Sequence, residues 1–179
     1  EITTRLVGSE MCIRDRVMGW NSWNTFGSHI NEELIMEITD KIVSEGYQQA
    51  GYEYVIIDDC WSLKERVDGK LVADPQLFPH GMKALSDYIH SKGLKFGMYS
   101  CAGFKTCAGY PSSYGHEFED ARQFAQWGVD YLKYDFCNFP ESGNAKNAYL
   151  TMAMALRNSG RETVSYTHLR AHETRSNLV

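Results

Sequence analysis

The chain is 179 residues long, with 43% hydrophobic and 13% aromatic residues and a formal net charge of −5. This length suits one globular domain with a core of its own, and the acidic balance argues against nucleic acid or an anionic membrane surface as a partner. No apolar run approaches the roughly 18 residues that a membrane span requires, and the first residues hold no apolar signal-peptide core.

The two ends of the chain differ from its middle. Residues 1–16 and 163–179 follow neither the two-residue period of a strand nor the 3.6-residue period of a helix. Both segments resemble the conceptual translation of a sequencing-library adapter, so we expect them to be non-native. The fold is therefore inferred from residues 17–162 alone.

Between these ends, apolar strands alternate with amphipathic helices. Asn31 is placed to cap the first helix, and Asp68–Gly69 marks a turn in a polar hairpin or long loop. Strands are expected near residue 18 and at 54–57, 94–101 and 129–136. Helices are expected around residues 34–43, 82–89, 118–125 and 145–157.

One helix between each pair of strands predicts a parallel sheet with right-handed crossovers. Polar, aromatic and acidic residues gather after the strands, where active sites lie both in (β/α)8 barrels and in doubly wound sheets. No Gly-x-Gly-x-x-Gly fingerprint follows the first strand, which favours the barrel. The fold class is therefore α/β, a (β/α)8 TIM barrel truncated to about four βα units, with the first and fourth strands as unpaired edges.

The strand at 129–136 carries the first candidate for chemistry. Lys133 and Asp135 share one face because side chains two residues apart on a strand point the same way. A cation beside a carboxylate lowers the carboxylate pKa and keeps it ionised, as a nucleophilic aspartate requires. The other interpretation is a structural ion pair at a strand end.

Four motifs in order, with short spacers, resemble the alpha-galactosidases of glycoside hydrolase family 27. The resemblance runs from about residue 18 to 161 and covers the first half of the catalytic barrel of that family. Its motifs are Met18-Gly19-Trp20-Asn21-Ser22-Trp23, Asp58-Asp59-Cys60-Trp61, Lys105-Thr106-Cys107-Ala108-Gly109-Tyr110-Pro111 and Tyr131-Leu132-Lys133-Tyr134-Asp135.

The resemblance implies retaining, metal-free and cofactor-free hydrolysis of terminal alpha-D-galactosides through a covalent glycosyl-enzyme. It implies that Asp135 is the nucleophile and that Lys133 is a sugar-binding cation beside it. It also implies the remaining sugar ligands, which are Asp58 and Asp59 as hydrogen-bond acceptors and Trp23 and Tyr99 as the lining of the subsite. Without the resemblance, Asp58 and Asp59 are candidates for capping the next segment, and Trp23 for packing.

Three alternatives remain open at this point. The same scaffold suits an alpha-N-acetylgalactosaminidase or a beta-L-arabinopyranosidase, and a sugar-binding protein without catalysis belongs to a different class. The acid/base aspartate that a retaining glycosidase needs lies on a later strand of the family, and no residue here matches it. We therefore expect the chain by itself to be inactive. An alpha-galactoside is the expected partner, and an oligomer remains open.

The cysteines bear on both structure and compartment. Cys107 and Cys137 follow neighbouring strands, within reach of a disulfide, and the resemblance implies that bridge. Ser28 stands where the family partner of Cys60 is expected, so Cys60 is a buried free thiol unless it meets Cys101. One disulfide favours an extracytoplasmic compartment. The histidines show no ligand spacing, so no metal is expected.

Overall fold

The structure, a computed structural model, describes residues 18–167, in which one or two helices separate each strand from the next. The elements are β1 (Gly19–Asn21), α2 (Trp23–Phe26), α3 (Glu32–Ser44), β2 (Tyr54–Ile56), α4 (Gly81–Ser91), β3 (Lys95–Cys101), α5 (Glu117–Trp127), β4 (Tyr131–Asp135), α6 (Ala145–Arg157) and β5 (Val164–Thr167). Within residues 18–167, no helix combines the length and the apolar character needed to cross a lipid bilayer.

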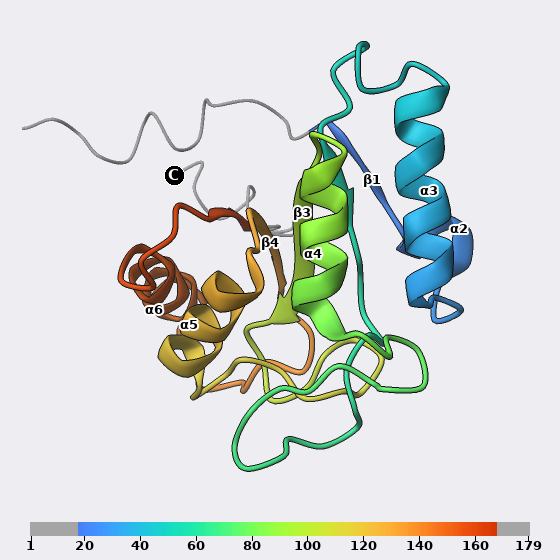
Figure 1. Cartoon of the computed structure of the whole chain (residues 1–179). Coiled ribbons are helices and arrows are strands. Elements are labelled where there is room, and N and C mark those ends of the chain that lie inside the picture. The colour runs from blue at the N-terminus through green and yellow to red at the C-terminus, as the bar shows by residue number, and fades with distance from the viewer. Residues whose placement is uncertain (1–17, 168–179) are drawn as a thin grey trace, which may run out of the picture.

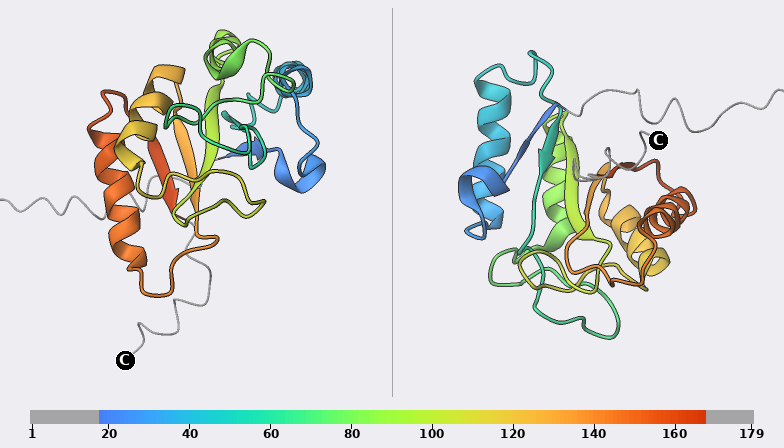
Figure 2. Two further views of the ribbon diagram at one scale, coloured as in Figure 1. Left: turned by 90° about the horizontal axis from the view of Figure 1, so that it is seen from below. Right: turned by 180° about the vertical axis from the view of Figure 1, so that it is seen from behind.

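The strands form one parallel sheet in sequential order, β1-β2-β3-β4-β5. Seen along the sheet, helices α3, α4, α5 and α6 follow one another in an arc on the same side of it (Figures 1 and 2). A doubly wound sheet would carry helices on both faces, whereas a barrel carries them only on the outside. The arrangement is that of consecutive βα units of a barrel, as the sequence predicts.

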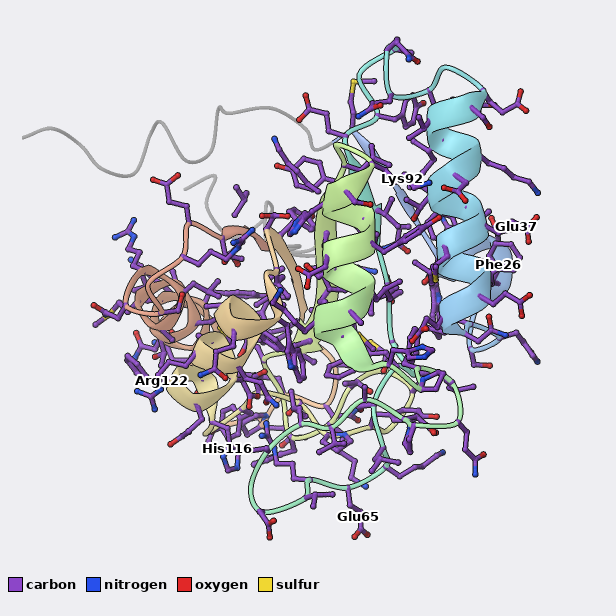
Figure 3. All side chains as sticks on the ribbon, in the orientation of Figure 1. Phe26, Glu37, Glu65, Lys92, His116 and Arg122 are labelled. Carbon is purple, nitrogen blue, oxygen red and sulfur yellow. A yellow bond between two sulfur atoms is a disulfide. The ribbon has the colours of Figure 1, made fainter. Side chains whose placement is uncertain are left out.

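The core lies between the sheet and this arc of helices, where side chains fill the space (Figure 3). Alternate residues of the central strands point toward the helices and are fully buried, because side-chain direction alternates along a strand. On the helices, buried apolar side chains recur at helical spacing. Fully buried members of this core include Val55, Phe96, Met98, Leu132, Ile35, Leu85, Ile89, Phe124 and Met152.

Local signals set the ends of the elements. The side chain of Asn31 accepts a hydrogen bond from the Leu34 amide at 2.8 Å, which confirms it as the cap of α3. The polar segment after β2 is a hairpin-like loop, with Asp68 and Gly69 at φ of 49° and 76°. Both residues are left-handed, as a two-residue hairpin turn requires. The short helix α2 was not predicted.

The prediction that the fourth strand is an unpaired edge is wrong. Strand β5 adds to β4 in parallel register, with Tyr131 opposite Val164 and Tyr134 opposite Thr167. Valine, tyrosine and threonine favour extended structure, which explains why a strand forms here despite the lack of a clear period. Strand β5 begins just inside the segment 163–179 that we expect to be non-native. The non-native origin of 1–16 and 163–179 stays a prediction.

Candidate functional site

The candidate site lies along the edge of the sheet where the strands end. Long loops gather there, at the lower side of the molecule in Figure 1, and connect β2 to α4 and β3 to α5. Because all strands are parallel, residues that follow different strands meet at this one edge. Asp135 is the last residue of β4 and lies opposite Cys101 of β3.

Asp58 is the buried centre of one half of the site. Its side chain is 3% exposed, and its Oδ2 accepts from Lys133 Nζ at 2.6 Å and from Asn21 Nδ2 at 2.8 Å. The amide of Asp58 donates to Ser22 Oγ at 3.0 Å. Asn21 ends β1, Asp58 follows β2 and Lys133 lies on β4, so three strands of the sheet hold this carboxylate in place.

Lys133 forms its ion pair with Asp58, and its role as a sugar-binding cation beside Asp135 stays a prediction. Within residues 18–167, the carboxylate that pairs with Lys133 is Asp58, and Lys133 Nζ also lies 5.3 Å from the centre of the Tyr99 ring. Lys133 and Asp135 do share a face of β4, but the curved sheet brings Asp58 closer. The ion pair thus connects β4 with the end of β2, rather than two residues of the same strand.

Asp59 points into the loop that follows β3. It is 2% exposed, and its carboxylate accepts hydrogen bonds from the Ala108 amide at 2.9 Å and the Cys60 amide at 2.8 Å. Burial raises the pKa of Asp59, and these hydrogen bonds partly offset the rise. The carboxylate therefore ties the loop carrying Cys107 to the end of β2.

Asp135 is held by donors on both of its oxygens. Oδ1 accepts from the Phe136 amide at 2.8 Å, and Oδ2 accepts from the Tyr99 hydroxyl at 3.3 Å. Burial and the nearby charges of Asp135 and Asp59 raise the pKa of Tyr99 well above its usual range, so the phenol keeps its proton. The carboxylate is thus fixed in orientation while remaining partly exposed.

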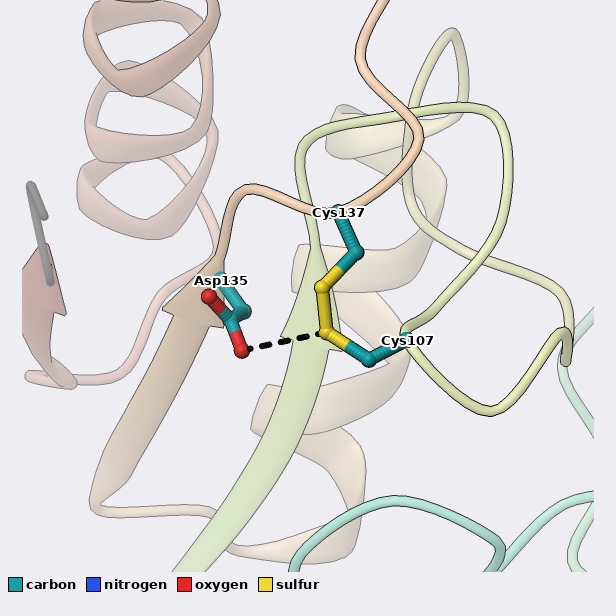
Figure 4. A group of neighbouring side chains, drawn as sticks. All are labelled: Cys107, Asp135 and Cys137. Atoms are coloured by element: carbon teal, nitrogen blue, oxygen red, sulfur yellow. Dashed lines mark hydrogen bonds between the residues drawn. A yellow bond between two sulfur atoms is a disulfide. The ribbon is translucent and has the colours of Figure 1, made fainter.

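A disulfide joins Cys107 to Cys137 next to this carboxylate, as Figure 4 shows, and confirms the predicted bridge. Cys107 Sγ lies 3.4 Å from Asp135 Oδ2. Cys60 and Cys101 are both buried free thiols and do not pair with each other. Among the described residues, Cys107, Asp135 and Cys137 form a group of metal-ligand types, but disulfide sulfurs are not thiolates, so the group does not suit a metal.

Trp23 begins α2 at the same edge, with 38% of its surface exposed. Its amide donates to Asn21 Oδ1 at 2.9 Å, while the other end of the Asn21 side chain binds Asp58. The structure therefore brings Asp58, Asp59, Tyr99, Lys133 and Asp135 together and attaches Trp23 through Asn21. Sequence reasoning gave no role to Asn21 or Ser22, although both lie in the first motif, at the end of β1 and directly after it.

Chemically, the site presents charged and aromatic groups suited to a polyol. Buried carboxylates accept hydrogen bonds from hydroxyl groups, Lys133 donates them, and aromatic rings cover the apolar faces of a sugar. Asp135 supplies an oriented carboxylate with no cation directly paired to it among the described residues.

Comparison with known proteins identifies relatives of this chain. The family model described as alpha galactosidase A (Melibiase_2) matches residues 16–177. Alpha-galactosidase A of Cellvibrio japonicus is 53% identical over 144 residues, covering 80% of this chain and 35% of that protein. Human alpha-galactosidase A is 47% identical over 162 residues, covering 84% and 38%.

Solved structures of alpha-galactosidases also match this chain. Alpha-galactosidase I from Mortierella vinacea superposes with a TM-score of 0.78 at 48% identity, covering 82% of this chain and 38% of that one. A beta-L-arabinopyranosidase from Geobacillus stearothermophilus, at 22% identity and a TM-score of 0.73, shares the fold. The chain spans little more than a third of the length of these curated relatives. It therefore belongs to the alpha galactosidase A family of glycoside hydrolases and forms part of that family's TIM barrel.

Proposed function

We propose that the complete protein is a retaining hydrolase of terminal alpha-D-galactosides, with Asp135 as its nucleophile. The observation that carries the proposal is the Asp135 carboxylate at the end of β4, oriented by the Phe136 amide and the Tyr99 hydroxyl. This carboxylate lies at the same edge of the sheet as the buried Asp58–Lys133 pair. A yeast alpha-galactosidase solved with raffinose is 45% identical over 83% of this chain, with a TM-score of 0.80.

In the first step, a carboxylate oxygen of Asp135 attacks the anomeric carbon as the bond to the leaving oxygen breaks. The leaving oxygen takes a proton from a second carboxyl group, and a galactosyl ester on Asp135 results. Water then attacks the anomeric carbon, the second carboxyl group takes a proton of the water, and the bond to Asp135 breaks. The Asp135 carboxylate is regenerated, and galactose leaves with its anomeric configuration retained.

The second carboxyl group comes from a later strand of the complete protein. Among the described residues, Asp59 is the site carboxyl with a raised pKa, yet its oxygens accept from two backbone amides. Donating a proton would disrupt these bonds, because both amides favour the ionised form. Asp59 thus suits hydrogen bonding to the sugar and support of the loop, rather than acid catalysis.

Sugar recognition falls to the residues around Asp135. Lys133 keeps protons free for sugar hydroxyls after it has paired with Asp58, because an ammonium has three donors. Tyr99 lies beneath Lys133, and the exposed ring of Trp23 provides an apolar surface. The high-identity relatives are alpha-galactosidases. They favour an alpha-galactoside as substrate over an N-acetylgalactosaminide or an arabinopyranoside.

The test replaces Asp135 by asparagine in the protein encoded by the complete reading frame. Turnover of a nitrophenyl alpha-galactoside should fall to the background rate, because an amide cannot form the glycosyl ester. The control Asp87→Asn alters an exposed carboxylate on α4 and should keep full activity. A fluorinated galactosyl inhibitor should add its sugar mass to the peptide holding Asp135. Near-normal turnover of Asp135→Asn, or labelling elsewhere, would rule out this nucleophile.

A further inference from the structure

The thiol of Cys101 binds both backbone groups of Cys137. Cys101 Sγ accepts from the Cys137 amide at 3.0 Å and donates to the Cys137 carbonyl at 3.2 Å. The side chain is fully buried at the end of β3. One small thiol therefore satisfies the two backbone polar groups of a residue that lies beyond the end of β4 and pairs with no strand of residues 18–167.

The backbone around this contact is packed too closely to move freely. A Cβ added to Gly103 would lie 1.9 Å from the Cys137 carbonyl oxygen, so the β3–α5 loop passes directly against the turn after β4. The Phe104 amide donates to the Asn138 carbonyl at 3.1 Å, and Asn138 Nδ2 donates to Thr106 at 2.9 Å. Asn138 itself has a φ of 51°. These contacts fix the turn that the thiol holds.

From Cys137 the contacts lead to the candidate nucleophile. The disulfide carries the position of Cys137 to Cys107, whose sulfur lies 3.3 Å from the Tyr99 hydroxyl and 3.4 Å from Asp135 Oδ2. A disulfide sulfur has no proton, so Tyr99 is the donor in this group. A displacement of Cys137 would therefore shift the sulfur that packs against the Asp135 carboxylate.

We propose that Cys101 is a positioning residue, whose thiol aligns the Cys107–Cys137 disulfide and, through it, the carboxylate of Asp135 and the hydroxyl of Tyr99. The consequence for catalysis rests on the proposed function, whereas the alignment of the disulfide does not. Burial raises the pKa of Cys101, so the thiol keeps the proton that it donates to the Cys137 carbonyl.

The alignment is measurable in the 179-residue chain without any activity. If Cys101 holds Cys137 in place, it raises the tendency of Cys107 and Cys137 to form their bridge. The chain is equilibrated in glutathione redox buffers, quenched with an alkylating reagent and analysed by peptide mass spectrometry. The variants are Cys101→Ala, which removes both hydrogen bonds, and Cys101→Ser, which keeps a donor and an acceptor. Cys60→Ala removes the other buried thiol and controls for the cavity.

The equilibrium constant for the bridge should fall about tenfold in Cys101→Ala, as expected for the loss of one or two buried hydrogen bonds. It should stay within about threefold of the unchanged chain in Cys101→Ser and Cys60→Ala. Equal equilibrium constants for the bridge in Cys101→Ala and Cys60→Ala would overturn the proposal. An equally large fall of this constant in Cys101→Ser and Cys101→Ala would overturn it as well. These results leave the identity of the nucleophile untouched, so the two proposals fail separately.

Amide hydrogen exchange keeps the proposal testable if Cys101→Ala does not fold. In the unchanged chain, the Cys137 amide should exchange as slowly as the amides within β4, because the thiol protects it. Exchange at the rate of the exposed turn amides of Asp68 and Gly69 would show that the thiol contact is not maintained, and would also overturn the proposal.

Discussion

At the scale of single residues, the pairing of Lys133 matters most for the site. The sequence places Lys133 and Asp135 on one strand face, about 7 Å apart along the strand. The structure pairs Lys133 with Asp58 instead, leaving Asp135 to hydrogen-bond donors that are neutral. The lysine thereby supports a buried carboxylate that two further strands also hold.

Removing the charge of Lys133 should leave Asp58 buried without its cation. Lys133→Met should lower the free energy of unfolding by about 2–4 kcal/mol, since an unpaired buried charge costs several kcal/mol. Adding Asp58→Asn should recover part of this loss, because the amide needs no counterion. Urea unfolding of Lys133→Met, of Asp58→Asn and of the double variant gives the coupling free energy between the two side chains. Purely additive losses would mean that the 2.6 Å pair contributes nothing.

At the scale of elements, ion pairs fasten the loops and helices to both ends of the sheet. At the candidate-site end, Arg66 in the β2–α4 loop binds both oxygens of Asp120 on α5 and the Ser112 carbonyl in the β3–α5 loop. At the opposite end, Asp130 joins His90 of α4 to Arg161 after α6. Each cluster connects segments that are far apart in the sequence.

Arg66→Met should destabilise the chain by about 3–5 kcal/mol, because Asp120 is buried and would lose its only charged partner among the described residues. The matched control is Lys83→Met, which breaks the exposed pair between Lys83 and Asp87 within α4. That variant should change stability by less than about 0.5 kcal/mol. Thermal and urea unfolding measure both, and similar losses in the two variants would contradict this reading of Arg66.

The Asp130 cluster should make stability depend on pH. Burial alone would raise the pKa of Asp130, but hydrogen bonds from His90, the Phe96 amide and Arg161 outweigh it and lower the pKa. A lowered pKa in the folded state adds stability above the unfolded value near 4, and this stability is lost as pH falls through the folded value.

The measurement is urea unfolding of the chain and of Asp130→Asn between about pH 3 and pH 7. The chain should be more stable than the variant at neutral pH, and the difference should shrink below about pH 4, where the carboxylate takes up a proton. Asp87→Asn serves as the control, because Asp87 is exposed and should show no such convergence. If the difference in unfolding free energy between the chain and Asp130→Asn stays constant with pH, the charge of Asp130 does not contribute to stability.

The elements were predictable because each has a local signal. Helical spacing of apolar residues gave α3, α4, α5 and α6, and continuous apolar runs gave the central strands. Helix α2 and strand β5 lacked such signals, since one is a single turn and the other is four residues long. The partner of Lys133 and the roles of Asn21 and Cys101 depend on the curvature of the sheet and on contacts between distant loops, which no sequence period records.

At the scale of the whole molecule, the described strands form an open sheet rather than a closed barrel. Strands β1 and β5 each lie at an edge of the sheet among the described residues. Closing a barrel removes edges altogether, whereas open edges present unpaired amide and carbonyl groups to other chains. The relatives extend well beyond this chain, which covers 35% of the Cellvibrio protein.

We therefore expect the 179-residue chain to self-associate and to hydrolyse no alpha-galactoside. Self-association is expected from the open edges. Inactivity is expected because we propose that the proton donor, whose contribution is typically 10²–10⁴-fold, lies on a later strand of the complete protein. Light scattering coupled to gel filtration measures the first, and release of nitrophenol measures the second. A monodisperse monomer that turns over substrate would contradict both expectations together.

The close approach at Gly103 has a consequence for redesigning this enzyme family. The β3–α5 loop is a natural place to diversify when a new substrate preference is sought, because it borders Asp59 and the disulfide. A library that randomises the loop from its first residue would mostly yield misfolded clones, since every side chain at position 103 collides with the Cys137 carbonyl. Diversity introduced at the exposed side chain of Ala108, with Gly103 and the left-handed Gly109 left fixed, would sample new surfaces while the frame beneath stays intact.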